Sequence, residues 1–245
     1  MKVSNNKIKD IKATLKNEPQ ELLNKPWLLV YIPMIVISFF MNKLSIKTDR
    51  VYLVETSVER YLKENSKILK NINHCGFHLE NYKSFEDFSH CLTLRLSDDP
   101  SSGKAYSYAI KGRFVNNSEA FVVFKDDTPI GYVFVEIINT KISQVNYLIK
   151  LPSYYFSFID LYIYKQYRGA GYHEILYTMT IDYLSRKGYR HFICWLMEHN
   201  QISIKAHSRI GISRITKIIT RRSFFFCSFL RTELIDMSLS DLIKS

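Results

Sequence analysis

Apolar and polar residues alternate in short runs through the second half of the chain, and this period of two predicts β-strands. Two such runs, 120–124 and 130–138, flank the segment Lys-Asp-Asp-Thr-Pro at 125–129, and together they predict a β-hairpin. Another run covers 158–163, and a further one covers 192–197. Shorter runs predict strands at 51–55, 215–219 and 223–230.

Between these runs the apolar residues recur about every 3.6 positions, which predicts helices. The clearest helix begins at Glu174 and ends at Lys187-Gly188. Three more helices are expected, from Ser57 to Ile72, from Ser84 through Cys91, and from Asn200 to Gly211. The segments 98–103 and 139–153 are predicted to be loops.

The segment from Phe158 to Glu174 joins a strand to a helix through the sequence Arg168-Gly-Ala-Gly171. A strand, a glycine turn and a helix in this order point several backbone N–H groups at one spot, with the positive end of the helix dipole behind them. Turns also use glycine for its backbone freedom alone, so the glycine pair is not sufficient by itself. The segment predicts a site for a phosphate or pyrophosphate, with Arg168 as an adjacent cation.

Charge favours an anionic partner. The 245 residues include 34 Lys and Arg against 23 Asp and Glu, a formal net charge of +11. This excess fits a nucleotide cofactor, a nucleic acid or an anionic membrane surface. The alternative is a composition rich in Lys, Ile, Asn, Tyr and Phe with no functional meaning. A nucleic acid ranks last, because no recognition motif is present and the basic residues do not cluster with aromatic ones.

Residues 26–41 form the most apolar run of the chain, between Lys25 and Lys43. With Pro33 inside it, the run is slightly short for a simple membrane span. It is interpreted as a buried element, a membrane-surface segment or a short spanning helix, so peripheral membrane contact stays open. No secretory signal peptide is expected, because the preceding basic stretch is too long and no small-residue cleavage site follows.

The four cysteines are scattered and show neither CxxC nor Cys/His metal spacing. Scattered single cysteines fit a reducing compartment, so a cytoplasmic protein is expected. Each cysteine is expected to pack as a small core residue. No metal site is expected.

Two motifs give the chain a resemblance to a known family. The sequence Arg168-Gly-Ala-Gly-Tyr-His173 resembles the acyl-CoA motif Arg/Gln-x-x-Gly-x-Gly/Ala of the GNAT superfamily of acyl-CoA N-acyltransferases. Downstream, the block from Asn200 to Ile212 resembles the family's Asn-x-x-Ala/Ser-x-x-x-Tyr-x-Lys-x-Gly-Phe. The two motifs in this order and at this distance are typical of the family. The resemblance covers residues 110–235 clearly, and the strand and helix at 51–72 more loosely.

The resemblance implies an α/β (α+β) fold. A mixed, mostly antiparallel central sheet with a splayed fourth and fifth strand pair would be flanked by helices, and 158–163 would be the fourth strand. The expected domains are an N-terminal extension at 1–50, which carries the apolar segment 26–41, and a GNAT-like acyltransferase domain at 51–245.

The resemblance also implies acetyl-CoA, or another acyl-CoA, as the acyl donor. Backbone groups of 161–163 would pair with the pantetheine arm, and N–H groups of the turn at 168–173 would receive the pyrophosphate. Asn200 would contact the cofactor arm, although it is also a good helix N-cap. The residues implied for cofactor binding are Leu161, Tyr162, Ile163, Arg168, Gly169, Ala170, Gly171, Tyr172, His173, Asn200 and Ser203.

Acyl transfer to an amine requires positioning, a base for the ammonium proton and a proton for the leaving thiolate. Asp160 is the candidate base. In a regular strand its side chain would face away from Leu161 and toward the same side as Tyr162. Glu136 on the preceding strand is the runner-up, and either carboxylate would otherwise be structural or bind substrate. His207 stands where the family often has its tyrosine acid, and its imidazolium would protonate the thiolate unless the ring serves only for packing.

His173 departs from the family motif, which prefers Gly or Ala. Its side chain would crowd the phosphates, contact them or lie on the helix surface. The predicted function is an N-acyltransferase, most simply an N-acetyltransferase, that acts on a primary amine by direct attack. The alternative is a catalytically degenerate GNAT-fold module that binds CoA or a partner protein. A small-molecule or sugar amine is the expected acceptor, with a protein amine still open.

Overall fold

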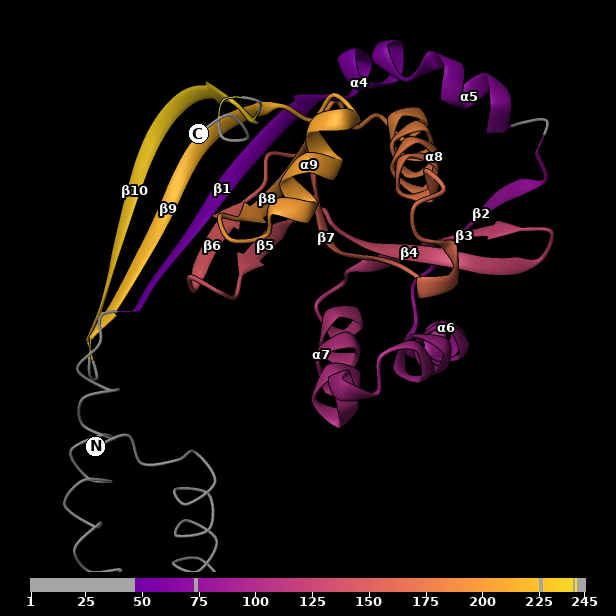
Figure 1. The fold of residues 1–245 in the computed structure, drawn as a ribbon, viewed down its shortest axis with the longest axis horizontal. Coiled ribbons are helices and arrows are strands. Elements are labelled where there is room, and N and C mark those ends of the chain that lie inside the picture. Colours follow the sequence, from indigo (N-terminus) through magenta and orange to yellow (C-terminus); the bar gives the residue numbers. More distant parts are fainter. Residues whose placement is uncertain (1–46, 73–74, 225–226, 240, 242–245) are drawn as a thin grey trace, which may run out of the picture. The chain divides into compact units, whose positions relative to one another are not determined.

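The computed structural model describes residues 47–72, 75–224, 227–239 and 241 (Figure 1). The chain divides into two compact units, one formed by 1–48 with 221–229 and the other by 49–220 with 230–245. The apolar segment 26–41 lies outside the described residues. Among the residues that are described, no helix is long and apolar enough to cross a membrane.

The second unit is organised around an eight-stranded sheet with the strand order β10-β9-β1-β8-β7-β4-β3-β2. Its strands are β1 (Lys47–Ser57), β2 (Phe77–Tyr82), β3 (Glu119–Lys125), β4 (Thr128–Glu136), β7 (Tyr155–Ile163), β8 (His191–Met197), β9 (Arg214–Phe224) and β10 (Cys227–Ser238). The pairs β1–β8, β2–β3, β3–β4 and β4–β7 are antiparallel, whereas β7 and β8 are parallel. The predicted mixed, mostly antiparallel sheet is therefore confirmed.

Helices cover both faces of the sheet (Figure 1). They are α4 (Val58–Glu64), α5 (Ser66–Ile72), α6 (Phe85–Asp98), α7 (Gly103–Val115), α8 (Tyr172–Arg186) and α9 (Gln201–Arg209). On one face, α4, α8 and α9 bury residues such as Tyr61, Leu176 and Ile204 against the sheet. On the other, α6 and α7 bury Phe88 and Ile110.

The segment 139–153 is not the loop that the sequence predicts. It forms a small hairpin of β5 (Asn139–Ile142) and β6 (Tyr147–Lys150). Ile142 and Val145 are buried in a third core cluster together with Val51 from β1 and Ile193 from β8. The two strands have only four residues each, which is too short for their alternation to stand out in the sequence.

The predicted helix from Ser57 to Ile72 is two helices. Ser57 caps α4 by accepting a hydrogen bond from the Arg60 backbone N–H. Asn65 ends this helix, and its side-chain amide donates to the backbone carbonyl of Ile210, far along the chain. This contact anchors the end of α4 to a residue distant in sequence, which local periodicity does not show.

Three further elements, β2, η2 and α7, were not predicted. The strand β2 is only half-buried at the edge of the sheet. The predicted loop at 98–103 holds a short 3₁₀ turn, η2 (Pro100–Ser102), and the start of α7. The apolar residues of α7 are spread around the helix instead of along one face, so its sequence lacks an amphipathic signal.

The strands β7 and β8 pair over only three positions, from Tyr155 opposite His191 to Ser157 opposite Ile193. Beyond these positions they diverge, which matches the splayed strand pair expected for the fold. Each strand keeps its other neighbour, since β7 pairs with β4 and β8 with β1. The divergence therefore opens a gap inside the sheet without exposing the outer edges of these two strands.

Candidate cofactor and acyl-transfer site

A cavity of about 730 Å³ lies where β7 and β8 diverge. The N-terminal turn of α8 and one side of α9 complete its walls. Of the residues predicted for cofactor binding, Leu161, Tyr162, Ile163, Arg168, Gly169, Gly171, Tyr172, His173, Asn200 and Ser203 line this cavity. Ala170 lines a second cavity next to it. The structure thus brings together residues that are as much as 42 positions apart in sequence, from Leu161 to Ser203.

Residues 168–173, which we name the glycine turn, connect β7 to α8. Gly169 and Gly171 have φ values of 84° and 80°, in the left-handed region that favours glycine. Gly171 is the N-cap of α8 and offers no side chain to satisfy the first N–H groups of the helix. Within the described chain, the backbone N–H groups of 169–173 donate no hydrogen bond. The turn therefore presents free donors at the positive end of a helix, as an anion site requires.

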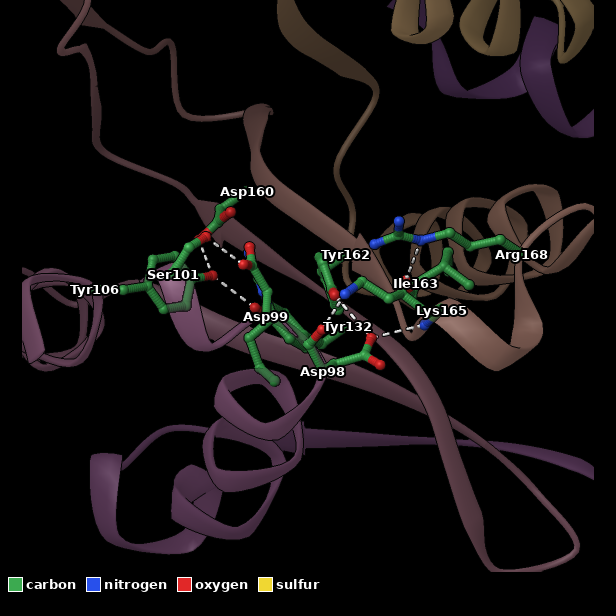
Figure 2. Close-up of polar contacts among 11 residues, drawn as sticks. Asp98, Asp99, Ser101, Tyr106, Tyr132, Asp160, Tyr162, Ile163, Lys165 and Arg168 are labelled. Carbon is green, nitrogen blue, oxygen red and sulfur yellow. Dashed lines mark hydrogen bonds and ion pairs between the residues drawn. The ribbon is translucent and has the colours of Figure 1, made fainter. Parts of the chain in front are cut away.

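Arg168 adds a cation to this turn. Its Nε donates to the backbone carbonyl of Ile163 at 3.0 Å, which folds the side chain back along the end of β7 (Figure 2). Its guanidinium carbon lies 5.0 Å from the centre of the Tyr162 ring. This anchoring uses one nitrogen, so the two terminal nitrogens remain for an anion.

Asp98 at the end of α6 ties that helix to the end of β7. Its carboxylate accepts hydrogen bonds from the Tyr162 hydroxyl at 2.8 Å and from the Lys165 backbone N–H at 2.7 Å (Figure 2). Partial burial opposes its ionisation, but these hydrogen bonds prevail and hold the pKa of Asp98 below its usual range. The Arg95 guanidinium packs over the Tyr162 ring, with its central carbon 3.8 Å from the ring centre. The aromatic ring at the cavity edge is thus held in place.

Asp160 occupies a β-bulge in the middle of β7. Its φ is 49°, and the register with β4 shifts at this point. The Tyr106 hydroxyl donates to its Oδ2 at 2.7 Å, and the Arg113 guanidinium lies 3.1 Å from the same oxygen. Its Oδ1 has no hydrogen bond in the described chain. Both partners hold Oδ2, so Oδ1 is the free acceptor of this carboxylate. The residue lines the cavity, and its positive φ means that its backbone is strained.

A second phenol extends this arrangement. Tyr132 and Tyr106 have their hydroxyl oxygens 2.6 Å apart. Because Tyr106 gives its proton to Asp160, Tyr132 is the donor in the second bond (Figure 2). Burial raises the pKa of both phenols, so both stay protonated and donate.

Glu136 lies apart from the cavity. It ends β4 opposite Ser157 and accepts a hydrogen bond from the Ser118 hydroxyl at 3.3 Å. Burial raises its pKa, although the charge of Arg113 partly offsets this effect. Of the two predicted carboxylates, only Asp160 reaches the cavity.

His207 is buried between α9 and α8. Its Nδ1 lies 2.7 Å from the Ser203 backbone carbonyl, which only accepts, so this nitrogen carries the proton. The Tyr177 hydroxyl donates a hydrogen bond to Nε2 at 2.9 Å. Burial lowers the pKa of His207 to about 4, partly offset by the bond to Ser203. At neutral pH the ring is therefore neutral, with both nitrogens engaged.

His173 turns inward from the glycine turn and lines the cavity. Its ring centre lies 4.9 Å from that of Tyr177 and 5.1 Å from that of His207. Burial, with a further contribution from His207, lowers the pKa of His173 to about 3. The ring packs as a neutral aromatic group in the wall instead of lying on the outer surface of the helix.

The depressed pKa of His207 predicts a loss of stability in acid. Between the folded value of about 4 and the ordinary value of about 6.5, the unfolded chain binds more protons, so stability falls as the pH drops through this range. The wild-type protein should lose about 2 kcal/mol of unfolding free energy through this group between pH 7 and pH 5. Urea unfolding at both pH values would measure it.

His207→Gln should remove the share of this pH dependence that comes from His207, since the amide does not titrate, while the buried His173 keeps its own share. The exposed His199 gives a matched control, and His199→Gln should leave the slope unchanged. An equal slope in wild type and H207Q would contradict the assignment of a buried neutral ring.

The residues of this region that escaped the sequence prediction include Tyr106, Arg113 and Tyr177. The first two lie on α7, which has no recognisable helical pattern, so no signal pointed to them. Tyr177 follows His173 by one helical turn and was visible only as an apolar position of α8. Among the described residues, no three His, Cys, Asp or Glu side chains are arranged to hold a metal ion.

Comparison with known proteins gives a family-level match. The model of the Acetyltransferase (GNAT) family matches residues 82–212. No curated protein sequence is significantly similar to the chain.

Solved structures with a similar fold share little sequence with the chain. A GCN5-related glucosamine N-acetyltransferase region of a fungal multi-domain GH3 β-N-acetylglucosaminidase has 15% identity and a TM-score of 0.50, with 80% of this chain and 22% of that one covered. A functionally unknown conserved protein from Staphylococcus epidermidis has 12% identity and a TM-score of 0.48, covering 72% and 62%. AAC(6')-Iy, bound to the bisubstrate analog CoA-S-monomethyl-acetylneamine, has 16% identity and a TM-score of 0.42, covering 56% and 90%. The chain thus spans less than two thirds of the first two structures, and these likenesses concern the fold.

Proposed function

Because the chain belongs to the Acetyltransferase (GNAT) family, we propose that it moves an acetyl group from acetyl-CoA to a primary amine. One observation carries the proposal. A single cavity has unpaired backbone N–H groups of the glycine turn at one end and the free Oδ1 of Asp160 in its wall. The first feature suits the pyrophosphate of the donor, and the second suits an attacking amine.

The donor would lie along the end of β7. Residues 161–163 lie in the cavity wall where β8 has diverged, and their backbone groups would pair with the amides of the pantetheine arm, with the Ile163 carbonyl shared with Arg168 Nε. The pyrophosphate would accept from the N–H groups of 169–173 and from Arg168. The acyl end would then lie in the deeper part of the cavity, near the bulge at Asp160.

The acceptor amine would attack the thioester carbonyl carbon, so that a C–N bond forms and the C–S bond breaks. The nitrogen would lose its proton to Asp160 Oδ1, while Tyr106 and Arg113 hold the other oxygen. Tyr106 and Arg113, both on α7, reach Asp160 from the face of the sheet opposite α8. We place the acceptor on that face. Placing the base in reach of the reacting nitrogen is the main contribution required of the protein.

His207 would position other groups instead of acting as an acid. An imidazolium acid needs a charged ring at neutral pH, whereas burial keeps this ring neutral. Its Nε2 holds the Tyr177 hydroxyl, and its Nδ1–H is used by the Ser203 carbonyl. The departing thiolate would therefore take its proton from water at the open side of the cavity.

Calorimetric titration with acetyl-CoA and with CoA tests the donor site, and thiol release with a panel of amines tests turnover. Arg168→Gln should weaken CoA binding about tenfold, or about 1.4 kcal/mol. Arg186→Gln, at the exposed far end of α8, is the matched control and should bind as wild type does. Absence of binding at millimolar CoA would overturn the proposal.

A second candidate is a module that binds CoA without turnover. His173 favours it, because its ring occupies part of the cavity wall where the family motif has a small residue. In that case CoA would bind but no amine would release thiol, and His173→Gly would not restore turnover. A small-molecule or sugar amine remains the proposed acceptor, and membrane contact through 26–41 stays a prediction.

A further inference from the structure

Trp195 lies on β8 at a point where this strand has already left β7. Pairing between the two strands ends at Ser157 and Ile193, whereas Trp195 stays paired with Leu53 of β1. The indole lines the cavity between the diverging strands and is partly buried. It therefore stands in the β8 wall of the gap, while Asp160 stands in the β7 wall.

The alternation of side chains along β8 decides on which face of the sheet the indole lies. Cys194 and Leu196 belong to the core cluster shared with α8 and α9, whereas Trp195 packs against the two clusters on the other face. Tyr162 of β7 packs on that other face too, and α7 holds Asp160 from there. The indole is thus on the face where we place the acceptor, opposite the face that carries α8.

The indole has no polar or aromatic partner of its own. The rings of Tyr106 and Tyr162 each have the Arg95 guanidinium over them, at 5.1 and 3.8 Å. Among the described residues, Trp195 has neither a cation nor another ring against it. Its indole N–H donates no hydrogen bond within them, and the nitrogen is not buried. A large aromatic side chain in a cavity wall, with its N–H unused, is suited to contact a ligand.

The charged groups on this face are paired with one another. Arg95 lies 3.1 Å from Asp99, and Arg113 lies 3.1 Å from Asp160. An acceptor that carries a carboxylate, such as an amino acid, would have to displace one of these partners. A ring without an acidic group requires no such exchange, because its face is apolar and its edge alone forms hydrogen bonds.

We propose that Trp195 is the platform on which the acceptor packs, and that the acceptor carries its primary amine on a six-membered ring. This inference rests on the proposed function. The ring packs its face on the indole and directs the amine to Asp160 Oδ1, while the indole N–H donates to a polar group at the ring edge. A rigid ring covers the indole without the loss of rotational freedom that a linear amine incurs. Trp195 then determines specificity and takes no part in proton transfer.

Steady-state kinetics of the full chain with two ring amines, glucosamine and benzylamine, and with the linear putrescine test the proposal. Trp195→Leu should raise KM for a ring amine about tenfold with kcat within a factor of two, and leave KM for putrescine and the affinity for CoA unchanged. Trp195→Phe keeps a ring and should restore most of the affinity. The ring amine whose KM rises shows whether the preferred ring is saturated or aromatic.

Met197→Leu is the matched control. Met197 lies two residues further along the same face of β8 and does not line the cavity, so this variant should change no KM. An equal rise of KM for ring and linear amines in W195L, an unchanged KM for both ring amines, or a wild type that prefers putrescine would overturn the proposal. The proposed function would stand in each of these cases.

Tryptophan fluorescence gives a readout that does not depend on turnover. The chain has two tryptophans, so Trp27→Phe leaves Trp195 as the sole emitter. With CoA present, a ring amine should change the emission of W27F, whereas putrescine should not. An emission that responds to neither ring amine would contradict the platform. Failure of the wild type to bind CoA would instead overturn the proposed function, and this inference with it.

Discussion

Replacing Asp160 with asparagine is expected to lower kcat/KM for acetyl transfer by about 10²- to 10³-fold while CoA binding stays within a factor of two. The amide has the same shape but accepts no proton from the attacking nitrogen. It still faces Arg113 and Tyr106, so the bulge in β7 has the same neighbours. Initial rates between pH 6 and 9 with a reactive amine, together with calorimetry of CoA, would measure both quantities.

Two variants separate the roles around this carboxylate. Tyr106→Phe removes one hydrogen bond to Oδ2 and should lower kcat by about 3- to 10-fold, with a shifted pH profile and an unchanged affinity for CoA. Glu136→Gln tests the other predicted carboxylate, which lies outside the cavity, and should retain at least half of the activity. A larger loss in E136Q than in D160N would show that the base was assigned to the wrong residue.

Substituting Gly131 with alanine should destabilise the protein by about 2–3 kcal/mol, because a Cβ there has no room. It would lie 2.6 Å from the Tyr162 backbone carbonyl and 2.6 Å from the Ile163 side chain. The first contact is with backbone, so β7 itself must move, and it would do so where the donor binds. We expect a melting temperature lower by about 5–10 °C and CoA binding about tenfold weaker.

Gly112→Ala supplies the control for this prediction. A Cβ at Gly112 meets nothing within 4 Å, and the residue lies inside α7. Alanine should therefore stabilise the helix by about 0.5–1 kcal/mol. Thermal unfolding of both variants gives the comparison, and a G131A protein that melts with the wild type would contradict the close approach of β4 to β7.

Local signals in the sequence account for much of the fold and for the cofactor end of the site. The hairpin of β3 and β4 is carried by two apolar runs and a Lys-Asp-Asp-Thr-Pro turn, all within twenty residues. The glycine turn was predicted because its function depends on the backbone of a few consecutive residues. Asn200 was expected to contact the cofactor arm, with a helix N-cap as the alternative, and its side chain does accept from the Ser203 backbone N–H as an N-cap does.

The acceptor side could not be predicted, because its geometry depends on contacts distant in sequence. Arg113 and Tyr106 reach Asp160 from a helix without an amphipathic pattern. The bulge at Asp160 arises from the register between β4 and β7, which no single strand reveals. The neutral state of His207 likewise follows from burial under α8, whereas the motif alone suggested a charged ring.

The position of β1 affects how the chain reaches its folded state. This strand is made early in synthesis, yet it is hydrogen-bonded between β8 and β9, and Leu53 pairs with Trp195. The sheet therefore cannot close until most of the chain has left the ribosome. Closing such a large loop is slow, and during that interval the apolar β1 has no partner. We expect slow folding, with β1 open to association with other chains until β8 and β9 pair with it.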